Sequence, residues 1–416
     1  LSPSDTALLN RQMALGFATE AGSTTSHTAI MARSLNIPAV VGLHEVLSRC
    51  ESGAPVILDG YAGLLIIHPT EQTRYEYGQI EKRRHEIEQR LEALRDTPAV
   101  TTDGRRIVLS ANVELPEDLP LIAESGAEGI GLYRTEFMFL NRVQFPGEDE
   151  QTNIYRQVVQ SSRPHLAIIR TLDLGGDKLP THQGLDPEVN PFLGWRAIRY
   201  CLERPEIFKV QLRAICRSNP GGKIRVMFPM IATREELTAA LTLLREAREE
   251  LKAAGIPAAE EVESGAMIEV PSAALIADRL APMVQFFSIG TNDLTQYIMA
   301  ADRTNERVAS LYQPTHPGVL SLIRRVVEAA RKNGIWVGVC GEMASDVVMT
   351  PVLIGLGVDE MSMGSVAVPR VKKAIQSLNF GECEALTGGL LQMDSGEEVR
   401  RQLEQMAREK YPELVT

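Results

Sequence analysis

Several residues beyond Pro98 have side chains suited to binding and transforming a small anion. Planar guanidinium donors fit phosphate and carboxylate oxygens, and the candidates of this kind are Arg134, Arg170, Arg196 and Arg303. Glu269 and Asp293 supply hard oxygen ligands of the kind that Mg²⁺ prefers. Cys340 can deliver a proton to carbon as a thiol, although a cysteine more commonly packs as a small buried apolar side chain. Together these residues indicate a site for a small substrate with several negative charges and a bound metal.

The stretch 286–296 brings several of these functions together. It has the pattern of a short buried strand that ends at Gly290 and then presents Asn292, Asp293 and hydroxyl groups. A strand of continuous apolar residues is typical of a parallel sheet covered on both faces, where ligands gather at the carboxyl ends of the strands. The alternative is a simple strand end, in which Asn292 and Asp293 only start the next helix.

Strands and amphipathic helices alternate beyond Pro98, and the clearest helices are predicted at 234–254 and 320–333. The predicted strands are 107–113, 129–133, 166–172, 224–230, 265–270, 286–290, 335–339 and 361–363. Eight strands over about 280 residues are typical of a TIM (β/α)8 barrel within the α/β class. The structural alternative is an open doubly wound sheet, but no Gly-x-Gly-x-x-Gly pattern follows the first strand.

The barrel explains where the candidate residues stand, because this fold takes its catalytic residues from directly after the strand ends. The second to seventh strands are followed by Arg134, by Arg170 with Asp173, by Pro229-Met230, by Glu269, by Asn292 with Asp293, and by Cys340. One polar residue at a strand end is ordinary, since loops are polar. A succession of them on one face is hard to produce by packing alone.

A second candidate region lies near the start of the chain. The polar run that begins at Gly22 changes to a helical pattern at His27 and continues to Arg33. A phosphoryl group on a histidine at a helix start would be stabilised by the free backbone N–H groups and by the positive end of the helix dipole. The alternative is a histidine that merely stands at the start of a helix.

A charged, helix-favouring segment from Glu71 to Arg95 connects the two regions and stops before Thr97-Pro98. Its apolar residues form a narrow seam near heptad spacing: Tyr77, Ile80, Ile87, Leu91 and Leu94. A seam this narrow buries only one face. The segment is therefore either a solvated rod between two domains or a surface helix that lies on one of them.

Composition and charge exclude several classes of protein. The 416 residues include 43 Lys and Arg against 54 Asp and Glu, a net charge of -11, so we expect no broad basic surface for nucleic acid or anionic lipid. The five cysteines are scattered and never form a Cys-x-x-Cys pair, which predicts a reducing, cytoplasmic location. No apolar run approaches the roughly 20 residues of a membrane span. Because the chain starts at Leu1 rather than Met, we expect a fragment of a longer protein.

The run from Gly22 to Arg33, continued by 36–42, closely resembles the phosphohistidine signature of the swivelling domain shared by enzymes that use phosphoenolpyruvate (PEP). The resemblance implies that His27 carries a phosphoryl group and that Thr6 hydrogen-bonds its ring. Two positions depart from the pattern: the family usually has Gly-Gly where this chain has Gly22-Ser23, and often Arg in place of Thr24. These departures concern the loop and its phosphate contacts, not the nucleophile.

The second region is similar to the PEP-binding barrel of Enzyme I of the PEP:sugar phosphotransferase system. The similarity rests on the runs 131–137, 170–178, 190–196, 228–230, 287–297 and 340–342. It implies that Arg134, Arg170, Arg196 and Arg303 bind PEP with Asn292 beside the phosphate, that Glu269 and Asp293 hold Mg²⁺, and that Cys340 protonates the enolate. It also implies a homodimer formed through the barrel. The expected organisation is a partial swivelling phosphohistidine domain over 1–70, a linker helix over 71–97, and the PEP-binding TIM barrel with a C-terminal helix over 98–416.

The predicted function is an Enzyme I-type phosphotransferase: PEP phosphorylates His27, pyruvate is released, and the group passes to the phosphocarrier protein HPr. The helical subdomain with which family members dock HPr would precede Leu1. One alternative is a fragment of a pyruvate phosphate dikinase or PEP synthase, which share both domains but also need an ATP-grasp domain. The other is a regulatory protein that keeps the barrel as a sensor of PEP, although His27, Cys340 and both metal carboxylates are present.

Overall fold

The computed structural model describes residues 15–21, 37–140, 142, 144–175, 188–303, 305 and 307–415. By its internal contacts the chain divides into two units. The N-terminal unit comprises Leu1–Ala93 and Ala301–Tyr312, and the barrel unit comprises Leu94–Ala300 and Gln313–Thr416.

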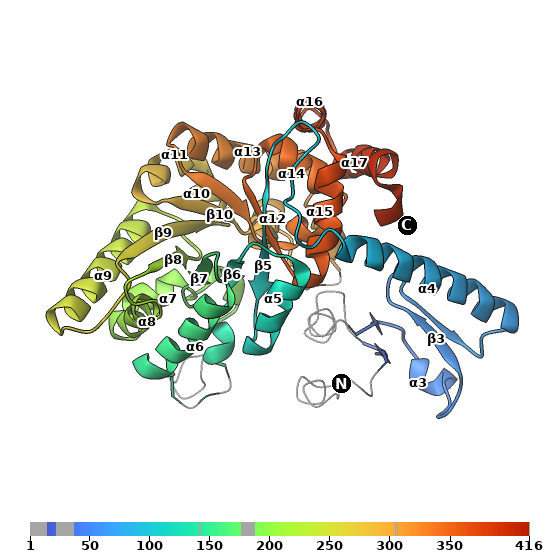
Figure 1. Cartoon of the computed structure of the whole chain (residues 1–416), viewed down its shortest axis with the longest axis horizontal. Helices are drawn as coiled ribbons and strands as arrows, with labels where there is room; N and C mark the ends of the chain where they lie inside the picture. Colours follow the sequence, from blue (N-terminus) through green and yellow to red (C-terminus); the bar gives the residue numbers. More distant parts are fainter. Residues whose placement is uncertain are drawn as a thin grey trace. The chain divides into compact units, whose positions relative to one another are not determined.

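The barrel unit is built on eight parallel strands that close into a barrel in sequence order (Figure 1). The strands are β5 (Val108–Val113), β6 (Ile130–Tyr133), β7 (Ala167–Arg170), β8 (Lys223–Phe228), β9 (Glu261–Ile268), β10 (Phe286–Ile289), β11 (Trp336–Val339) and β12 (Glu360–Met363). Each overlaps one of the eight predicted strands, so the predicted TIM barrel is confirmed. Strands β6, β7, β10 and β12 are buried along their whole length, as expected for strands covered on both faces.

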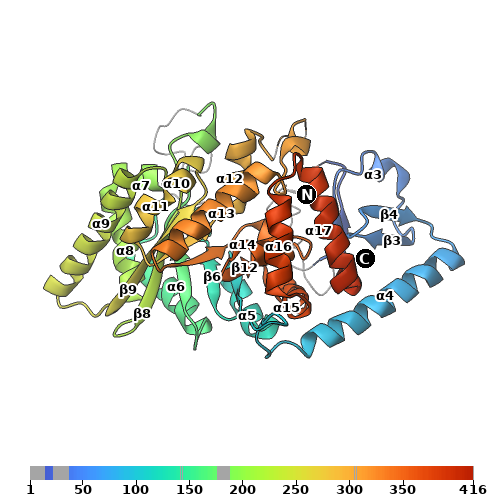
Figure 2. The same ribbon diagram turned by 90° about the horizontal axis from the view of Figure 1, so that it is seen from above.

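Helices lie outside the strands (Figures 1 and 2). They are α5 (Leu119–Ser125), α6 (Glu148–Ser161), α7 (Ile198–Glu203), α8 (Pro205–Arg217), α9 (Arg234–Ala253), α10 (Pro271–Leu275), α11 (Ala277–Leu280), α12 (Thr291–Met299), α13 (Pro317–Lys332), α14 (Thr350–Leu356), α15 (Val368–Ser377), α16 (Phe380–Leu390) and α17 (Gly396–Lys410). Helices α16 and α17 pack on α14. The predicted helices at 234–254 and 320–333 correspond to α9 and α13, and α9 begins at a capping box formed by Thr233 and Glu236.

Short 3-10 helices complete the connections of the barrel unit. They are η1 (Pro116–Asp118), η2 (Glu136–Met138), η5 (Pro191–Leu193), η6 (Ala281–Met283), η8 (Glu342–Ser345), η9 (Ser365–Ala367) and η10 (Pro412–Leu414). Two of them, η2 and η8, directly follow the ends of β6 and β11 and therefore stand where a TIM barrel carries its chemistry.

Side chains fill the interior of the barrel. An apolar cluster is formed by Leu132, Ile168, Met227, Met267, Phe286 and Cys340, and the Phe286 ring stacks on Trp336 with centroids 4.7 Å apart. Gly265 faces this stack, where an added Cβ would lie 2.2 Å from the Phe286 ring. The barrel is thus a packed core rather than a channel, and a ligand can bind only at its ends.

The N-terminal unit contains short elements in its described part. Strands β1 (Phe17–Ala18) and β2 (Ala39–Val40) pair in parallel, whereas β3 (Val56–Asp59) and β4 (Leu64–Ile67) form an antiparallel hairpin. A turn that begins at Asp59-Gly60 joins β3 to β4, and Asp59 Oδ1 accepts hydrogen bonds from the backbone N–H groups of Tyr61 (2.9 Å) and Ala62 (3.1 Å). The remaining helices of this unit are α3 (Val46–Arg49), α4 (Glu71–Glu92) and η7 (Ala309–Leu311).

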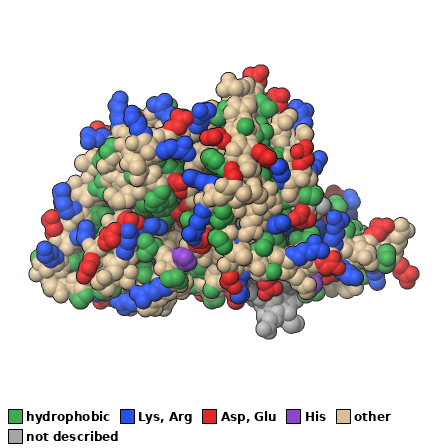
Figure 3. Space-filling model, turned by 45° about the horizontal axis from the view of Figure 1, so that its top comes forward, with side chains coloured by type: hydrophobic (Ala, Val, Ile, Leu, Met, Phe, Trp, Pro, Cys, Tyr) green, Lys and Arg blue, Asp and Glu red, His purple; other side chains and the backbone are tan. Residues whose placement is uncertain are grey.

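Among the helices that the structure describes, none combines the length and the apolar character needed to cross a membrane. On the face shown in Figure 3, Lys and Arg side chains are interspersed with Asp and Glu side chains. That face therefore offers no continuous basic patch, in keeping with the net charge of -11.

Candidate active site

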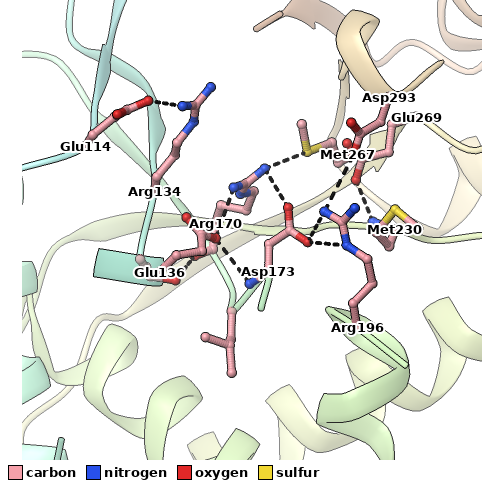
Figure 4. A network of polar contacts seen from close by, with 12 residues as sticks. Glu114, Arg134, Glu136, Arg170, Asp173, Arg196, Met230, Met267, Glu269 and Asp293 are labelled. Carbon is pink, nitrogen blue, oxygen red and sulfur yellow. Dashed lines mark hydrogen bonds and ion pairs between the residues drawn. The ribbon is translucent and has the colours of Figure 1, made fainter. Parts of the chain in front are cut away.

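A network of ion pairs and hydrogen bonds joins residues that follow β7, β9 and β10 (Figure 4). Arg170 is the last residue of β7, Glu269 directly follows β9, and Asp293 lies in the first turn of α12 after β10. Arg196 comes from the loop that precedes α7. The carboxyl ends of neighbouring strands thus place four of the predicted site residues at one end of the barrel.

Arg170 is almost fully buried, with 8% of its surface exposed, and two carboxylates hold its guanidinium group. Nη2 lies 3.0 Å from Glu136 Oε1, and Nη1 lies 3.1 Å from Asp173 Oδ2. Burial alone would lower the pKa of Arg170, but the charges of Glu136 and Asp173 outweigh burial and raise that pKa. The guanidinium therefore stays charged although water is excluded from it.

Arg196 is held by the same aspartate. Asp173 Oδ1 accepts from Arg196 Nη2 at 2.7 Å and from Nε at 3.2 Å, and Arg196 Nη2 also lies 3.5 Å from Asp293 Oδ2. Burial again opposes the charged form, and Asp173 and Asp293 together raise the pKa of Arg196. Asp173 therefore bridges two cationic groups and fixes the spacing between them.

Arg134 stands after β6 and pairs with Glu114, which follows β5. Figure 4 shows this pair beside the cluster formed by Arg170 and Glu136. Arg134 lies within the barrel unit, whereas Arg303 lies in the segment Ala301–Tyr312 of the N-terminal unit. Thr6 and His27 lie outside the described residues. The roles of all four residues stay predictions.

Glu269 is 2% exposed, and its position is fixed by backbone on two sides. Its Oε1 accepts from the backbone N–H of Met230 at 2.7 Å, and Met230 adopts the left-handed conformation with φ of 56°. At Gly290 an added Cβ would lie 2.5 Å from Glu269 Oε2, so a larger residue there would displace the carboxylate. Burial, together with the negative charges of Asp293 and Asp173, raises the pKa of Glu269 to about 8.

The two carboxylates fit a divalent cation. Among the described residues no group of three or more His, Cys, Asp and Glu side chains could hold a metal ion. Mg²⁺ needs fewer protein ligands, because it commonly binds one or two carboxylates and takes its other ligands from water and substrate phosphate. The pKa of Glu269 is raised by burial and by repulsion from Asp293, and a bound cation would offset both by favouring the charged carboxylate. Glu269 and Asp293 are therefore a suitable pair for Mg²⁺.

Asn292 lies in the first turn of α12, after β10, and Cys340 directly follows β11. Asn292 Oδ1 accepts from the backbone N–H of Glu342 at 2.8 Å, which links the two strand ends. Cys340 is 2% exposed, with Sγ 3.7 Å from the carbonyl oxygen of Ile289. Burial raises the pKa of the Cys340 thiol to about 11, partly offset by a hydrogen bond with Ser288. The thiol thus keeps its proton at neutral pH and is able to donate it.

Comparison with known proteins identifies the families and the relatives to which the chain is similar. The family model of the PEP-binding domain of PEP-utilising enzymes matches residues 88–380, and that of the mobile domain of these enzymes matches residues 1–63. The chain is 47% identical over 399 residues to a phosphoenolpyruvate-protein phosphotransferase of Staphylococcus carnosus, with 96% of this chain and 70% of that protein covered. The corresponding enzyme of Bacillus subtilis is 48% identical over 401 residues with the same coverage.

The chain belongs to the phosphoenolpyruvate-protein phosphotransferase family. The family and the enzyme class predicted from the sequence are confirmed. The match to the mobile domain also agrees with the predicted fold class, in which a phosphohistidine domain precedes the barrel. A further relative, the phosphoenolpyruvate-protein phosphotransferase of Priestia megaterium, is 46% identical over 402 residues and is covered to 70% of its length.

In this member of the phosphotransferase family, three carboxylates at the barrel end had no role predicted from the sequence: Glu114, Glu136 and Asp173. Each pairs with an arginine of the site, and Glu136 Oε1 also accepts from the backbone N–H of Asp173 at 3.1 Å. Two of them stand close in sequence to arginines of the site, Glu136 after Arg134 and Asp173 three residues after Arg170. That proximity is the signal that could have found them, because buried arginines require partners of opposite charge.

Proposed function

We propose that this chain takes the phosphoryl group of PEP onto His27, releases pyruvate, and passes the group on to the phosphocarrier protein HPr. The observation that carries this proposal is the pair of guanidinium groups bridged by Asp173, next to the two carboxylates Glu269 and Asp293. PEP has a phosphate and a carboxylate on a three-carbon frame, which such a set of donors and metal ligands suits.

The arginines would bind the anion. Arg170 and Arg196 are held at a fixed spacing by Asp173, so their donors are oriented before the substrate arrives. Preorganised charges of this kind, in a site from which water is excluded, stabilise transferring phosphoryl groups without reorganisation during the reaction. Arg134 and Arg303 would complete the set of arginines, with Asn292 beside the phosphate.

Glu269 and Asp293 would hold Mg²⁺. When bound, the cation would neutralise negative charge on the phosphoryl oxygens. Asp293 Oδ2 also lies 3.5 Å from Arg196 Nη2, so one of the two metal carboxylates belongs to the same network as the arginines.

In the transfer, the bond between phosphorus and the enol oxygen of PEP breaks, and a bond between phosphorus and a ring nitrogen of His27 forms. Thr6 would orient that ring. The electron pair left on the enolate takes a proton at carbon from Cys340, which gives pyruvate. A covalent phosphohistidine divides the reaction into two steps, so that PEP and HPr never have to meet.

The test is mass spectrometry of the intact protein after incubation with PEP and Mg²⁺. We expect the mass to increase by one phosphoryl group per chain, and His27→Ala to abolish this increase. His85→Ala is the matched control, because His85 is exposed on α4, with its Nε2 3.0 Å from Gln89 Nε2 of the same helix. If PEP binds to the parent protein but never phosphorylates it, the chain is a PEP sensor instead.

We further propose a homodimer formed through the barrel, as the resemblance to Enzyme I implies. Sedimentation at micromolar concentration with PEP and Mg²⁺ present should give twice the chain mass of 45.8 kDa. The sequence-based division into 1–70, 71–97 and 98–416 provides the matching control, since a fragment spanning 98–416 should dimerise as the full chain does. A full chain that stays monomeric at every concentration would contradict the proposal.

We propose a cytoplasmic location. All five cysteines are free in the structure: Cys50, Cys201, Cys216, Cys340 and Cys383. Four of them are buried thiols in the barrel unit, and free thiols in this number are typical of a reducing compartment.

A further inference from the structure

One buried polar residue behind the candidate site has no part in binding or chemistry. Gln211 lies on α8, on the face that also presents Phe208, Leu212 and Ile215, and only 2% of its surface is exposed. An amide buried among apolar side chains costs free energy unless its donors and acceptor are satisfied. The hydrogen bonds that Gln211 makes must therefore offset the cost of burying its amide.

The amide of Gln211 connects three elements. Its Oε1 accepts from the backbone N–H of Leu172 at 2.9 Å, just after β7. Its Nε2 donates to Thr135 Oγ1 at 3.3 Å, after β6, and to the hydroxyl of Tyr155 on α6 at 3.1 Å. Tyr155 in turn donates to Gln151 Oε1 at 3.0 Å. Both N–H protons of the Gln211 amide and the hydroxyl proton of Tyr155 thus have acceptors.

These bonds belong to a set that fixes the turn after β7. The carbonyl of Arg170 accepts from Thr135 Oγ1 at 3.0 Å, and the N–H of Thr171 donates to the Met227 carbonyl at 2.9 Å. The next N–H, that of Leu172, donates to Gln211, and the N–H of Asp173 donates to Glu136. Four consecutive residues are thus each held through the backbone, three of them by side chains from α8 and from the segment after β6.

We propose that Gln211 is a positioning residue for the PEP site. It holds in place the turn that begins at Arg170 and ends at Asp173. The inference rests on the function proposed above. Arg170 and Asp173 form an ion pair, and Asp173 also holds Arg196, so the placement of both arginines depends on this turn. Gln211 reaches the turn from outside the barrel, and its amide bonds to Leu172, Thr135 and Tyr155 rather than to the charged groups.

Loss of the Gln211 amide would leave the Leu172 N–H buried without an acceptor. The turn would then move to satisfy it, because an unpaired buried donor is costly. Positioning of binding groups is sensitive to such shifts, and a displacement of about 1 Å can cost on the order of 100-fold in catalytic efficiency. A residue that only stabilises the fold would lower stability without changing the affinity for PEP.

The experiment compares Gln211→Leu with Tyr155→Phe in the full chain. Both variants break the same buried network, but Tyr155→Phe leaves the bond from Leu172 to Gln211 intact. We expect both to unfold at lower denaturant concentration than the parent. Gln211→Leu should raise KM for PEP roughly tenfold or more with a smaller change in kcat, whereas Tyr155→Phe should keep KM within about twofold of the parent.

Two further variants keep the test decisive if Gln211→Leu does not fold. Gln211→Glu keeps an acceptor for Leu172 and should restore most of the affinity for PEP. Thr135→Val removes the bond to the Arg170 carbonyl at nearly constant volume and should raise KM as Gln211→Leu does. The proposal is overturned if Gln211→Leu or Thr135→Val folds and keeps the parent KM, or if Tyr155→Phe raises KM equally.

Calorimetry with PEP and Mg²⁺ separates this inference from the proposed function. A parent protein that binds PEP without transferring the phosphoryl group would contradict the transfer function, yet the affinities of the variants would still test Gln211. A parent that does not bind PEP at all would overturn both.

Discussion

Replacement of Glu269 by glutamine is expected to abolish phosphorylation of the chain by PEP while the barrel stays folded. The substitution removes one of the two negative charges proposed to hold Mg²⁺, but glutamine can still accept the hydrogen bond from the Met230 N–H. Asp293→Asn should act in the same way. Phosphoryl transfer per chain, measured at increasing Mg²⁺ concentration, tests both variants.

Glu261→Gln is the matched control. Glu261 lies on the same strand, β9, at its other end, where it is exposed and pairs with Lys223 at 2.8 Å. We expect parent activity from this variant. The metal assignment is wrong if Glu269→Gln transfers the phosphoryl group at the parent rate with an unchanged requirement for Mg²⁺.

The pH dependence of stability gives a second readout for Glu269→Gln, in metal-free buffer. Burial and the charge of Asp293 raise the pKa of Glu269 from 4.5 to about 8 in the folded protein. Between these values the folded state binds a proton that the unfolded state releases, so the parent should lose stability as the pH rises through this window. Glu269→Gln carries no such proton and should show a weaker loss. Denaturant midpoints at about pH 5 and about pH 8.5 measure the difference.

The barrel could be predicted from the sequence because its signals are local. Runs such as 286–290 and 335–339 are short, apolar and bounded by glycine, and helices such as α9 and α13 have one apolar face. Since this fold fixes where strand ends lie, the sequence also sufficed to place Arg170, Glu269 and Asp293 together. Their convergence follows from topology rather than from the contacts of any one residue.

The partners of these residues could not be predicted in the same way. Asp173 has the sequence context of a loop residue, and only the folded turn shows that it bridges Arg170 and Arg196. Gln211 has the pattern of a polar residue on an amphipathic helix, yet it lies on the buried face of α8. The pairing of polar side chains depends on distances between helices and strands, and the periodicity of the sequence does not reveal these distances.

The thiol of Cys340 is proposed to act only in the second half of the reaction, the protonation of the enolate. Transfer of the phosphoryl group leaves an enolate, which needs a proton at carbon before it leaves as pyruvate. Cys340 lies at the end of β11 in the apolar cluster with Met227 and Met267, and the carbonyl of Cys340 accepts from Asn112 Nδ2 at 3.1 Å. Its raised pKa of about 11 keeps the proton on sulfur until a stronger base, such as an enolate carbon, takes it.

Cys340→Ala should therefore slow pyruvate formation far more than it weakens PEP binding. General acids typically contribute factors of about 10² to 10⁴, so we expect pyruvate formation to fall by about 100-fold or more. The affinity for PEP should stay close to that of the parent, because the arginines and the metal carboxylates are unchanged. Calorimetric titration with PEP and an enzymatic assay for pyruvate, on the same preparation, measure the two quantities.

Cys216→Ala is the matched control for the loss of a buried sulfur. Cys216 is fully buried on α8, and burial raises the pKa of its thiol to about 12, but it lies away from the strand ends that carry the site. If both cysteines serve only packing, the two variants should show the same modest loss of stability and normal turnover. Normal pyruvate formation in a well-folded Cys340→Ala protein would remove this thiol from the mechanism, whereas retained PEP binding with turnover lost would identify it as the general acid.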